Sequence, residues 1–496
     1  MATTPLREQL RGALDIIERL EAENGALRTA NDSLRAANED LGDRVTRLEA
    51  QLKADSSTTG KPPSSDPIGP RKKRAERRAE ARAEKRTRGK QPGAPGANLA
   101  RRPADVVAEH RPASCQSCGT GLAGAQVVGT QVRQVVDLPP VVPVVTDHVA
   151  YRLRCACGAE TVAEFPPQAR AYVCFGPEVR AFATYLMDRQ HLPVERTAEL
   201  LEDLLGVKVS TGWLCAVQAE AAGRLRPFVA WLKDRLQKEP VVHADETGTA
   251  VGTTKHWAHT LTTKLLTLIA VHPKRGIEAL NDIGALALYA GTVVHDGYAT
   301  YDLFTAATHA QCNVHALRHL KSVGEAQAFS PWAEQMTGIL MDAKVASEAA
   351  ASAGRRRVDP GRAGAIRAAY HAGLDEVLAL LPDGPPPRRR ARPRWSEAQR
   401  KTWNLATRLR ADADQFLCCL DDTRVAWDNN VAERALRMVK IHDKISGPFA
   451  SLSGAEAFAA VRSYLQTAAN HHQNLLGVLR RLFTTGAWFP APPAPG

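Results

Sequence analysis

The chain has 496 residues, and its 65 Lys and Arg outnumber its 53 Asp and Glu to give a formal net charge of +12. This length can bury a sizeable core in about three domains, and clustered basic charge favours a polyanionic partner. No apolar run reaches the ~18 residues of a membrane span, and Met1–Leu10 lacks a signal-peptide pattern. We therefore expect a soluble, cytoplasmic protein with no membrane partner. Nine cysteines indicate metal ligation in a reducing compartment more than a disulfide framework.

A seven-residue repeat predicts a coiled coil over residues 1–54. Leucine recurs at one core position of the heptad. Three successive heptads have Asn at the other core position (Asn24, Asn31 and Asn38). A buried Asn fixes the register and favours a parallel pair, because each amide needs the amide of its partner. We expect a homodimer or a higher oligomer through residues 10–53. The alternative is an amphipathic helix that folds back on the body of the protein.

Residues 55–104 are rich in Pro, Gly and Ser and predict a linker without a core of its own. Within the linker, Arg71–Lys90 holds 11 basic and 3 acidic residues. Such a run neutralises DNA phosphates without reading sequence. The predicted DNA-binding residues are Arg71, Lys72, Lys73, Arg74, Arg77 and Arg78. The alternative is a solvated charge run.

Two cysteine pairs predict a zinc ribbon over residues 105–170. Cys115 and Cys118 form the first pair, Cys155 and Cys157 the second, and a valine-rich segment between them is typical of strands. Four thiolates can bind Zn²⁺ tetrahedrally and stabilise a segment too small to fold alone. The second pair has only one intervening residue, and reduced structural thiols are the alternative.

Residues 171–238 have a helical pattern that resembles a helix-turn-helix. One amphipathic helix is predicted over Glu195–Leu205, Gly206 interrupts it, and Ser210 or Thr211 would cap the next. The second helix has no Lys or Arg between Thr211 and Gly223, whereas base reading usually uses cationic or amide side chains. DNA reading by this region is therefore left open.

Three acidic residues in three predicted elements suit metal binding. Asp245 lies in a predicted strand over Pro240–Val251, Asp296 ends a second apolar strand, and Glu433 lies on a helix for which Asp428 is the expected N-cap. Carboxylates from two strands and a helix can hold two divalent cations about 3.5–4 Å apart for phosphodiester chemistry. The alternative is that these are solvated surface acids.

The same helix presents basic side chains. Residues at intervals of three and four share one face with Glu433, and Arg434 lies beside it. Phosphate neutralisation is therefore predicted for Arg434, Arg437, Lys440 and Lys444, with solvated helix charges as the alternative.

The order of elements predicts an α/β core of the ribonuclease-H-like kind. After the Asp245 strand come two meandering strands, over Lys255–Thr263 and Leu265–Val271, then a helix over Ile277–Ile283 and the Asp296 strand. Residues 239–321 and 425–485 would form this core. Residues 322–424, Ala-rich and helical, would be an insertion, and residues 486–496 a disordered tail.

Several motifs together resemble the insertion sequence 66 family of transposases. They are KPPSSD (61–66), GKQPGAPG (89–96), the cysteine pairs, HADET (243–247), HDGYATY (295–301), CNVH (312–315), NNVAERALR (429–437), GPFAS (447–451) and GAEAFAAVRSYL (454–465). The resemblance implies an enzyme in which Asp245, Asp296 and Glu433 bind Mg²⁺ or Mn²⁺. Such an enzyme cleaves double-stranded DNA at the ends of a mobile element and joins the 3′ hydroxyl to target DNA. Accessory proteins of the element and association with the nucleoid are further expectations.

Two rival functions remain. One is a non-catalytic, zinc-containing dimeric DNA-binding protein derived from a transposase. The other is a ribonuclease-H-like nuclease acting on junctions or RNA. Cys312 and His315 match a Cys-x-x-His motif of the family, but two ligands do not complete a zinc site. We assign no metal to them.

Overall fold

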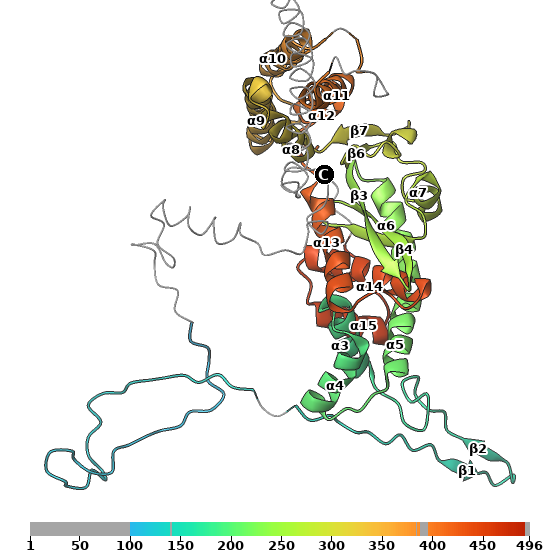
Figure 1. Ribbon diagram of the computed structural model, residues 1–496. Coiled ribbons are helices and arrows are strands. Elements are labelled where there is room, and N and C mark those ends of the chain that lie inside the picture. Colours follow the sequence, from blue (N-terminus) through green and yellow to red (C-terminus); the bar gives the residue numbers. More distant parts are fainter. Residues whose placement is uncertain (1–99, 139–140, 383, 387–394, 492–496) are drawn as a thin grey trace, which may run out of the picture. The chain divides into compact units, whose positions relative to one another are not determined.

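The computed structural model describes residues 100–138, 141–382, 384–386 and 395–491 (Figure 1). The predicted coiled coil and the basic run lie outside these residues. Two compact units are present: the first contains described residues of 149–199 and 209–496, and the second those of 68–148 and 200–208. No helix among the described residues has the length and apolar character needed to cross a membrane.

The valine-rich segment before residue 150 is not a strand. Its described residues carry no regular secondary structure, and Val128 and Val144 are more than nine-tenths exposed. The prediction of strands there is wrong. Proline explains the difference, because Pro139, Pro140 and Pro143 cannot donate hydrogen bonds to the ladder of a sheet.

The first secondary structure in the described part of the first unit is a short antiparallel hairpin of β1 (Arg152–Arg154) and β2 (Glu160–Val162).

A five-stranded mixed sheet forms the centre of the first unit. The strands lie in the order β5-β4-β3-β6-β7, with β5, β4 and β3 antiparallel and β3, β6 and β7 parallel. Their bounds are Val241–Val251 (β3), Thr254–Thr262 (β4), Thr267–His272 (β5), Thr292–His295 (β6) and Thr308–Gln311 (β7). The predicted strands are therefore present, and α7 has the predicted bounds Ile277–Ile283.

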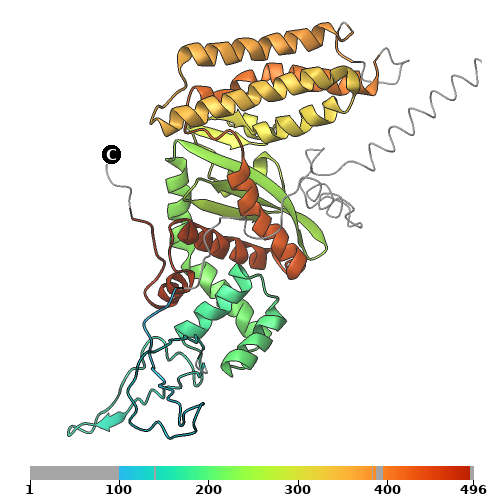
Figure 2. The ribbon, with the colours of Figure 1, turned by 90° about the vertical axis from the view of Figure 1, so that its left-hand side faces the viewer.

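Helices cover both faces of the sheet (Figure 2). On one face α13 (Asn430–Ile445) and α14 (Leu452–Asn470) bury Leu436, Val439 and Phe458 against Ile269 and its neighbours. The opposite face packs in a second cluster with α5 (Thr211–Arg224), α6 (Arg226–Gln237), α7 and α15 (Leu475–Thr484). The alternation of side chains along each strand supplies apolar groups to both clusters.

Helix α14 also satisfies the backbone of the edge strand β5. The hydroxyl of Ser463 accepts the N–H of Ile269 at 2.8 Å, and the hydroxyl of Thr467 accepts the N–H of Thr267 at 3.1 Å. All four residues are buried. An exposed edge strand invites pairing with another chain, so these two hydroxyls close the edge of the sheet.

The predicted insertion, residues 322–424, is helical. A hydrophobic cluster separate from those of the sheet includes Met336, Tyr370 and Leu409, and it extends to Leu320 in the helix that leads into the insertion. Ser396 begins one of its helices with a capping box, in which Ser396 and Gln399 satisfy each other's backbone N–H. The helices are α8 (Asn313–Gly324), α9 (Ser330–Ser352), α10 (Pro360–Ala379), α11 (Glu397–Ala411) and α12 (Ala413–Phe416).

The helical region before the sheet contains α3 (Pro177–Thr184), a π-helical turn (Tyr185–Arg189) and α4 (Val194–Leu205), followed by α5 and α6. Gly206 has a φ of +62°, a conformation in which glycine carries no steric penalty. The Ser210 hydroxyl caps α5 by accepting the N–H of Trp213 at 3.1 Å. The predicted interruption and cap are therefore present.

The described part of the C-terminal segment is ordered against the core, contrary to the prediction of a disordered tail. The N–H of Trp488 donates to the hydroxyl of Tyr464 at 2.9 Å. The ring of Phe489 lies 5.6 Å from that of Trp231, centroid to centroid. The contacts of these two residues with Tyr464 and Trp231 decide the outcome, although Phe489 itself is 38% exposed.

The packing of α13 on the sheet gives a stability prediction. Leu436 is 3% exposed, and Leu436→Ala is expected to lower the free energy of unfolding by about 2–5 kcal/mol through lost burial and a cavity. Leu288→Ala, at a leucine that is 84% exposed, should change it by less than about 0.5 kcal/mol. Urea unfolding followed by circular dichroism measures both. Equal effects of the two variants would contradict the described packing.

Candidate active site

Asp245 and Asp296 follow the segment over which β3 and β6 pair in parallel, with Asp245 inside the longer strand β3 and Asp296 directly after β6. His243 of β3 pairs with Val294 of β6, and each acidic residue follows its member of that pair by two positions. Glu433 lies in the first turn of α13, which packs against β3 and β4. Burial raises the pKa of Asp245 well above its usual value, and the charges of Asp296, Glu246 and Glu433 raise it further. The three carboxylates are therefore within electrostatic reach of one another.

Asn429 fixes the start of α13 against β3. Its Oδ1 lies 3.0 Å from Nδ1 of His243, and its Nδ2 donates to the carbonyl of Ala244 at 2.9 Å. Its backbone N–H donates to Sγ of Cys312 at 3.2 Å. Asn429 is fully buried. We did not single it out from the sequence, although the Asn-Asn pair before the helix was the available signal.

The helix N-cap differs by one residue from the prediction. Asn429, not Asp428, occupies the N-cap position of α13, and its side chain makes no capping bond. The carboxylate of Asp428 instead accepts the N–H of Asn430 at 3.0 Å. The amide of Asn429 is engaged by β3, so a neighbouring carboxylate satisfies the backbone at the helix start.

Glu246 is the adjacent acid on β3, and it is neutralised where Asp245 is not. Arg275 donates to its Oε1 from Nε at 2.9 Å and from Nη2 at 2.7 Å, and the hydroxyl of Tyr301 donates to Oε2 at 2.6 Å. Among the described residues, no Lys or Arg forms an ion pair with Asp245, Asp296 or Glu433. The three predicted ligands thus form a locally uncompensated acidic group.

Arg408 of the insertion approaches the backbone next to Asp296. Gly297 has a φ of +86°, and a Cβ atom there would lie 2.7 Å from Nη2 of Arg408 and 2.7 Å from Oε1 of Gln311. Arg408 donates to that Gln311 oxygen at 2.8 Å. The positive φ favours glycine at 297, and any larger residue would also displace the ends of these two side chains. Sequence reasoning missed Arg408, because nothing in its own helix distinguishes it from other basic residues.

The predicted phosphate-binding residues of α13 have different surroundings. Arg434, Arg437 and Lys444 are exposed. Lys440 is half-buried and donates to the carbonyl of Gly248, and its Nζ lies 3.9 Å from Asp443. Burial lowers the pKa of Lys440. Three of the four cations therefore face solvent, and the fourth connects α13 to β3.

Cys312 and His315, which we assigned to no metal, lie beside Glu433. One ligand atom from each of the three residues lies within 4.8 Å of the other two. Cys312 is buried and stands at the N-terminus of α8. Burial raises the pKa of its thiol to about 11, which disfavours the thiolate form that binds metals.

The two predicted zinc-binding pairs each lie in a tight turn that ends in a glycine. In the first, the N–H of Gly119 donates to the carbonyl of Cys115, four residues earlier, at 2.9 Å; in the second, the N–H of Gly158 donates to the carbonyl of Cys155, three residues earlier, also at 2.9 Å. Both glycines have a positive φ. The hydrogen bond between Cys118 and Thr120 is the main cause that lowers the pKa of Cys118 to about 7, and the backbone N–H of Cys157 lowers the pKa of Cys155. Thiols poised to ionise suit Zn²⁺.

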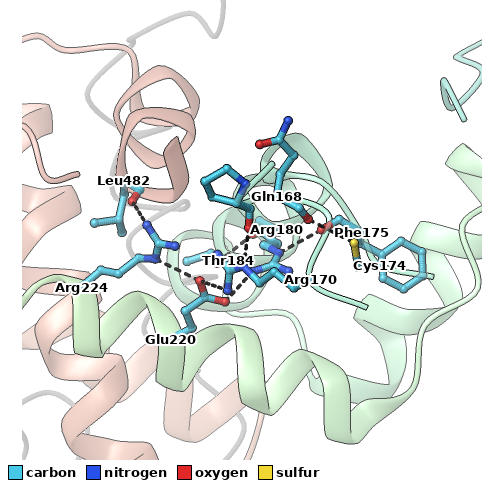
Figure 3. Close-up of polar contacts among 10 residues, drawn as sticks. Gln168, Arg170, Cys174, Phe175, Arg180, Thr184, Glu220, Arg224 and Leu482 are labelled. Atoms are coloured by element: carbon cyan, nitrogen blue, oxygen red, sulfur yellow. Dashed lines mark hydrogen bonds and ion pairs between the residues drawn. The ribbon is translucent and has the colours of Figure 1, made fainter. Parts of the chain in front are cut away.

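The second helix of the helix-turn-helix-like region uses its acidic residue within the protein. Figure 3 shows Glu220 of α5 surrounded by three arginines. Arg180 lies 2.6 Å, Arg224 3.0 Å and Arg170 3.1 Å from its carboxylate oxygens. Arg224 also donates to the carbonyl of Leu482 in α15 at 3.1 Å. This part of α5 therefore holds α3 and α15 together, and DNA reading by the region stays a prediction.

The acidic group fits divalent cations. Three carboxylates without cationic partners offer hard oxygen ligands, which Mg²⁺ and Mn²⁺ prefer. Oε1 of Glu433 is buried and has no hydrogen-bond partner among the described residues. A buried, unsatisfied carboxylate oxygen is costly unless a cation or a donor meets it.

Comparison with known families agrees with this arrangement. Residues 172–457 match the model of the transposase IS66 family, and residues 112–158 match the zinc-finger binding domain of transposase IS66. Residues 3–100 match a family of unknown function. No curated protein matches the chain.

The match to the transposase model and the zinc-finger match identify the chain as a transposase, a class of protein that acts on DNA. The transposase model covers more than half of the 496 residues. The chain therefore belongs to the IS66 family of transposases, and the resemblance found in the sequence is confirmed.

The raised pKa of Asp245 gives a prediction with a defined sign. The pKa of Asp245 is higher in the folded state than in the unfolded state. The folded protein therefore loses stability as the pH rises through the folded-state pKa and the carboxyl ionises. Asp245→Asn should therefore raise the free energy of unfolding at about pH 8 without Mg²⁺ or Mn²⁺, by about 1.4 kcal/mol per unit of pKa elevation. The gain should vanish toward about pH 4.

Asp422 supplies the matched control, because hydrogen bonds from Arg424 lower its pKa. Asp422→Asn should lower the free energy of unfolding at neutral pH. Urea titrations between about pH 4 and pH 8 measure both variants. If Asp245→Asn is destabilising throughout this range, the carboxylates do not repel one another as described.

Proposed function

We propose that this transposase cleaves phosphodiester bonds at the ends of a mobile element and joins the freed 3′ hydroxyl to target DNA. Two divalent cations bound at the acidic group would activate the attacking oxygen and stabilise the leaving oxygen. Asp245, Asp296 and Glu433 would hold these cations. The observation that carries the proposal is that Asp245 and Asp296 each lie two residues beyond the same parallel pair of β3 and β6, while Asn429 bonds the start of α13, and with it Glu433, to β3. The raised pKa of Asp245, to which the charges of Asp296 and Glu433 contribute, agrees with this placement.

The sheet supports a ribonuclease-H-like core. Three antiparallel strands precede two parallel strands in the order β5-β4-β3-β6-β7, and α7 precedes β6 in the chain. Ligand sites of such sheets lie near the carboxyl ends of the parallel strands. The proposal is supported by Asp296, which directly follows β6, by Asp245, two residues beyond the last parallel pair of β3, and by Glu433 in the first turn of α13, which packs against β3.

Basic groups around the acidic group suit a DNA backbone. Arg434, Arg437 and Lys444 are exposed on α13, and Arg408 reaches the backbone beside Asp296 from the insertion. Cations placed next to metal-bound carboxylates can bind the phosphates that flank the reacting one. We include the basic run Arg71–Lys90 and dimerisation through residues 10–53 in the proposal, although both lie outside the described residues.

Metal-dependent cleavage of the element's own ends tests the function. The parent protein should nick duplex DNA carrying these ends in the presence of Mg²⁺ or Mn²⁺, and it should join them to a target duplex. Asp245→Asn and Glu433→Gln should each reduce the rate by about 1,000-fold or more, because each removes a charged ligand. DNA binding in a gel-shift assay should be retained.

The control is Glu278→Gln, at an exposed acid of α7 that pairs with Lys274 at 2.9 Å; it should cleave at the parental rate. A parent that binds the ends but cleaves no DNA under either metal would favour the non-catalytic DNA-binding protein. Preference for branched or RNA–DNA hybrid substrates over the element ends would favour the nuclease.

The cysteine turns give a separate prediction about zinc. We propose that Cys115, Cys118, Cys155 and Cys157 bind one Zn²⁺. Metal analysis of the purified full-length protein should find about one zinc per chain. Cys118→Ser should lose it, whereas Cys215→Ser, at an exposed cysteine outside the two turns, should keep it. Equal zinc content in all three proteins would contradict this ligand set.

A further inference from the structure

One oxygen of the Glu433 carboxylate lacks a partner in the described part of the protein. Its Oε1 is buried and has no hydrogen-bond partner among the described residues. A carboxylate that must bind a cation through one oxygen is usually held in place through the other by a hydrogen-bond donor. The surroundings of Glu433 therefore need to supply a donor.

His315 of α8 carries the matching unsatisfied group. Its Nδ1 is also buried without a partner in the part of the chain that the structure describes. Its Nε2 lies 3.5 Å from Nη1 of Arg318. A guanidinium can only donate, so Nε2 is the acceptor of this pair and the neutral ring carries its proton on Nδ1. His315 thus has a free donor, and Glu433 has a free acceptor.

The two groups are close enough to form this pair. A ring nitrogen of His315 and a carboxylate oxygen of Glu433 lie within 4.8 Å, in the cluster that also contains Cys312. The third member, Cys312, is engaged by Asn429, whose backbone N–H its Sγ accepts at 3.2 Å. Rotation of the two side chains about their terminal bonds would be needed to bring Nδ1 of His315 and Oε1 of Glu433 into hydrogen-bond contact.

We propose that His315 is a positioning residue, whose Nδ1–H holds one oxygen of Glu433 and so turns the carboxylate toward the cation shared with Asp245. This inference rests on the proposed function of Glu433 as a metal ligand. It gives the Cys-x-x-His segment a role at the active site without making His315 a ligand. The residue acts through Glu433 and touches neither cation nor DNA.

The test replaces His315 by Asn or by Gln, whose side-chain amides place their hydrogen-bond donor at different positions. The side-chain nitrogen of asparagine comes close to the place of histidine Nδ1, whereas that of glutamine comes close to Nε2. His315→Asn should therefore keep the affinity of the full-length protein for Mn²⁺ within about threefold of the parent. His315→Gln and His315→Ala should weaken it by about 10-fold or more, the range of lost outer contacts at metal sites.

Mn²⁺ binding is read by electron paramagnetic resonance of the free ion, without DNA and independently of activity. His371→Ala, at an exposed histidine of α10, is the matched control and should bind as the parent does. In the cleavage assay, His315→Ala should need about 10-fold more Mg²⁺ for half-maximal rate and should recover most of the parental rate at saturating Mg²⁺. His315→Asn should need no more than the parent.

The outcomes separate this inference from the proposed function. If Glu433→Gln loses Mn²⁺ affinity and His315→Ala does not, His315 has no positioning role, while the metal site stands. If the parent and Glu433→Gln bind Mn²⁺ equally, the proposed metal site itself is wrong. Equal losses in His315→Asn and His315→Gln would show that the ring acts by packing and would overturn the inference. Circular dichroism and melting temperature establish that each variant is folded.

Discussion

The amide of Asn429 is the contact on which the geometry of the candidate active site depends. It joins three elements that are distant in the chain, because it meets His243 and Ala244 of β3 through its side chain and Cys312 at the start of α8 through its backbone. Only a side chain that both donates and accepts can satisfy these neighbours in a buried position. The first turn of α13, and with it Glu433, takes its place on the sheet from this residue.

The hydrophobic packing around that contact has to withstand electrostatic repulsion. Asp245 lies near two further carboxylates, and none of the three has a cationic partner among the described residues. The neighbouring Glu246 shows how the same strand treats a structural acid, since Arg275 and Tyr301 satisfy it completely. Glu246 is neutralised by its neighbours and Asp245 is not. The uncompensated charge of Asp245 lowers the stability of the folded protein, as is common at functional sites.

The parts that the sequence predicted well are those with a strong local pattern. The strands around Asp245 and Asp296, the helix α7 and the start of α5 follow from alternation, apolar runs and a serine cap. Errors arose where a distant contact decided the outcome. Trp488 is ordered by the hydroxyl of Tyr464, and Arg408 reaches Gly297 only because the insertion folds over the sheet edge. No local pattern in one sequence reveals such contacts.

The position of the insertion has a consequence for biosynthesis. Glu433 follows Asp296 by 137 residues, and most of this interval folds around a hydrophobic cluster of its own. A ribosome needs on the order of ten seconds to add that length. Throughout this time the emerging chain carries two of the three acids and lacks the last. If the three acids act as proposed, a nascent or prematurely terminated chain lacks one ligand of the metal site, and only the finished molecule can cut DNA.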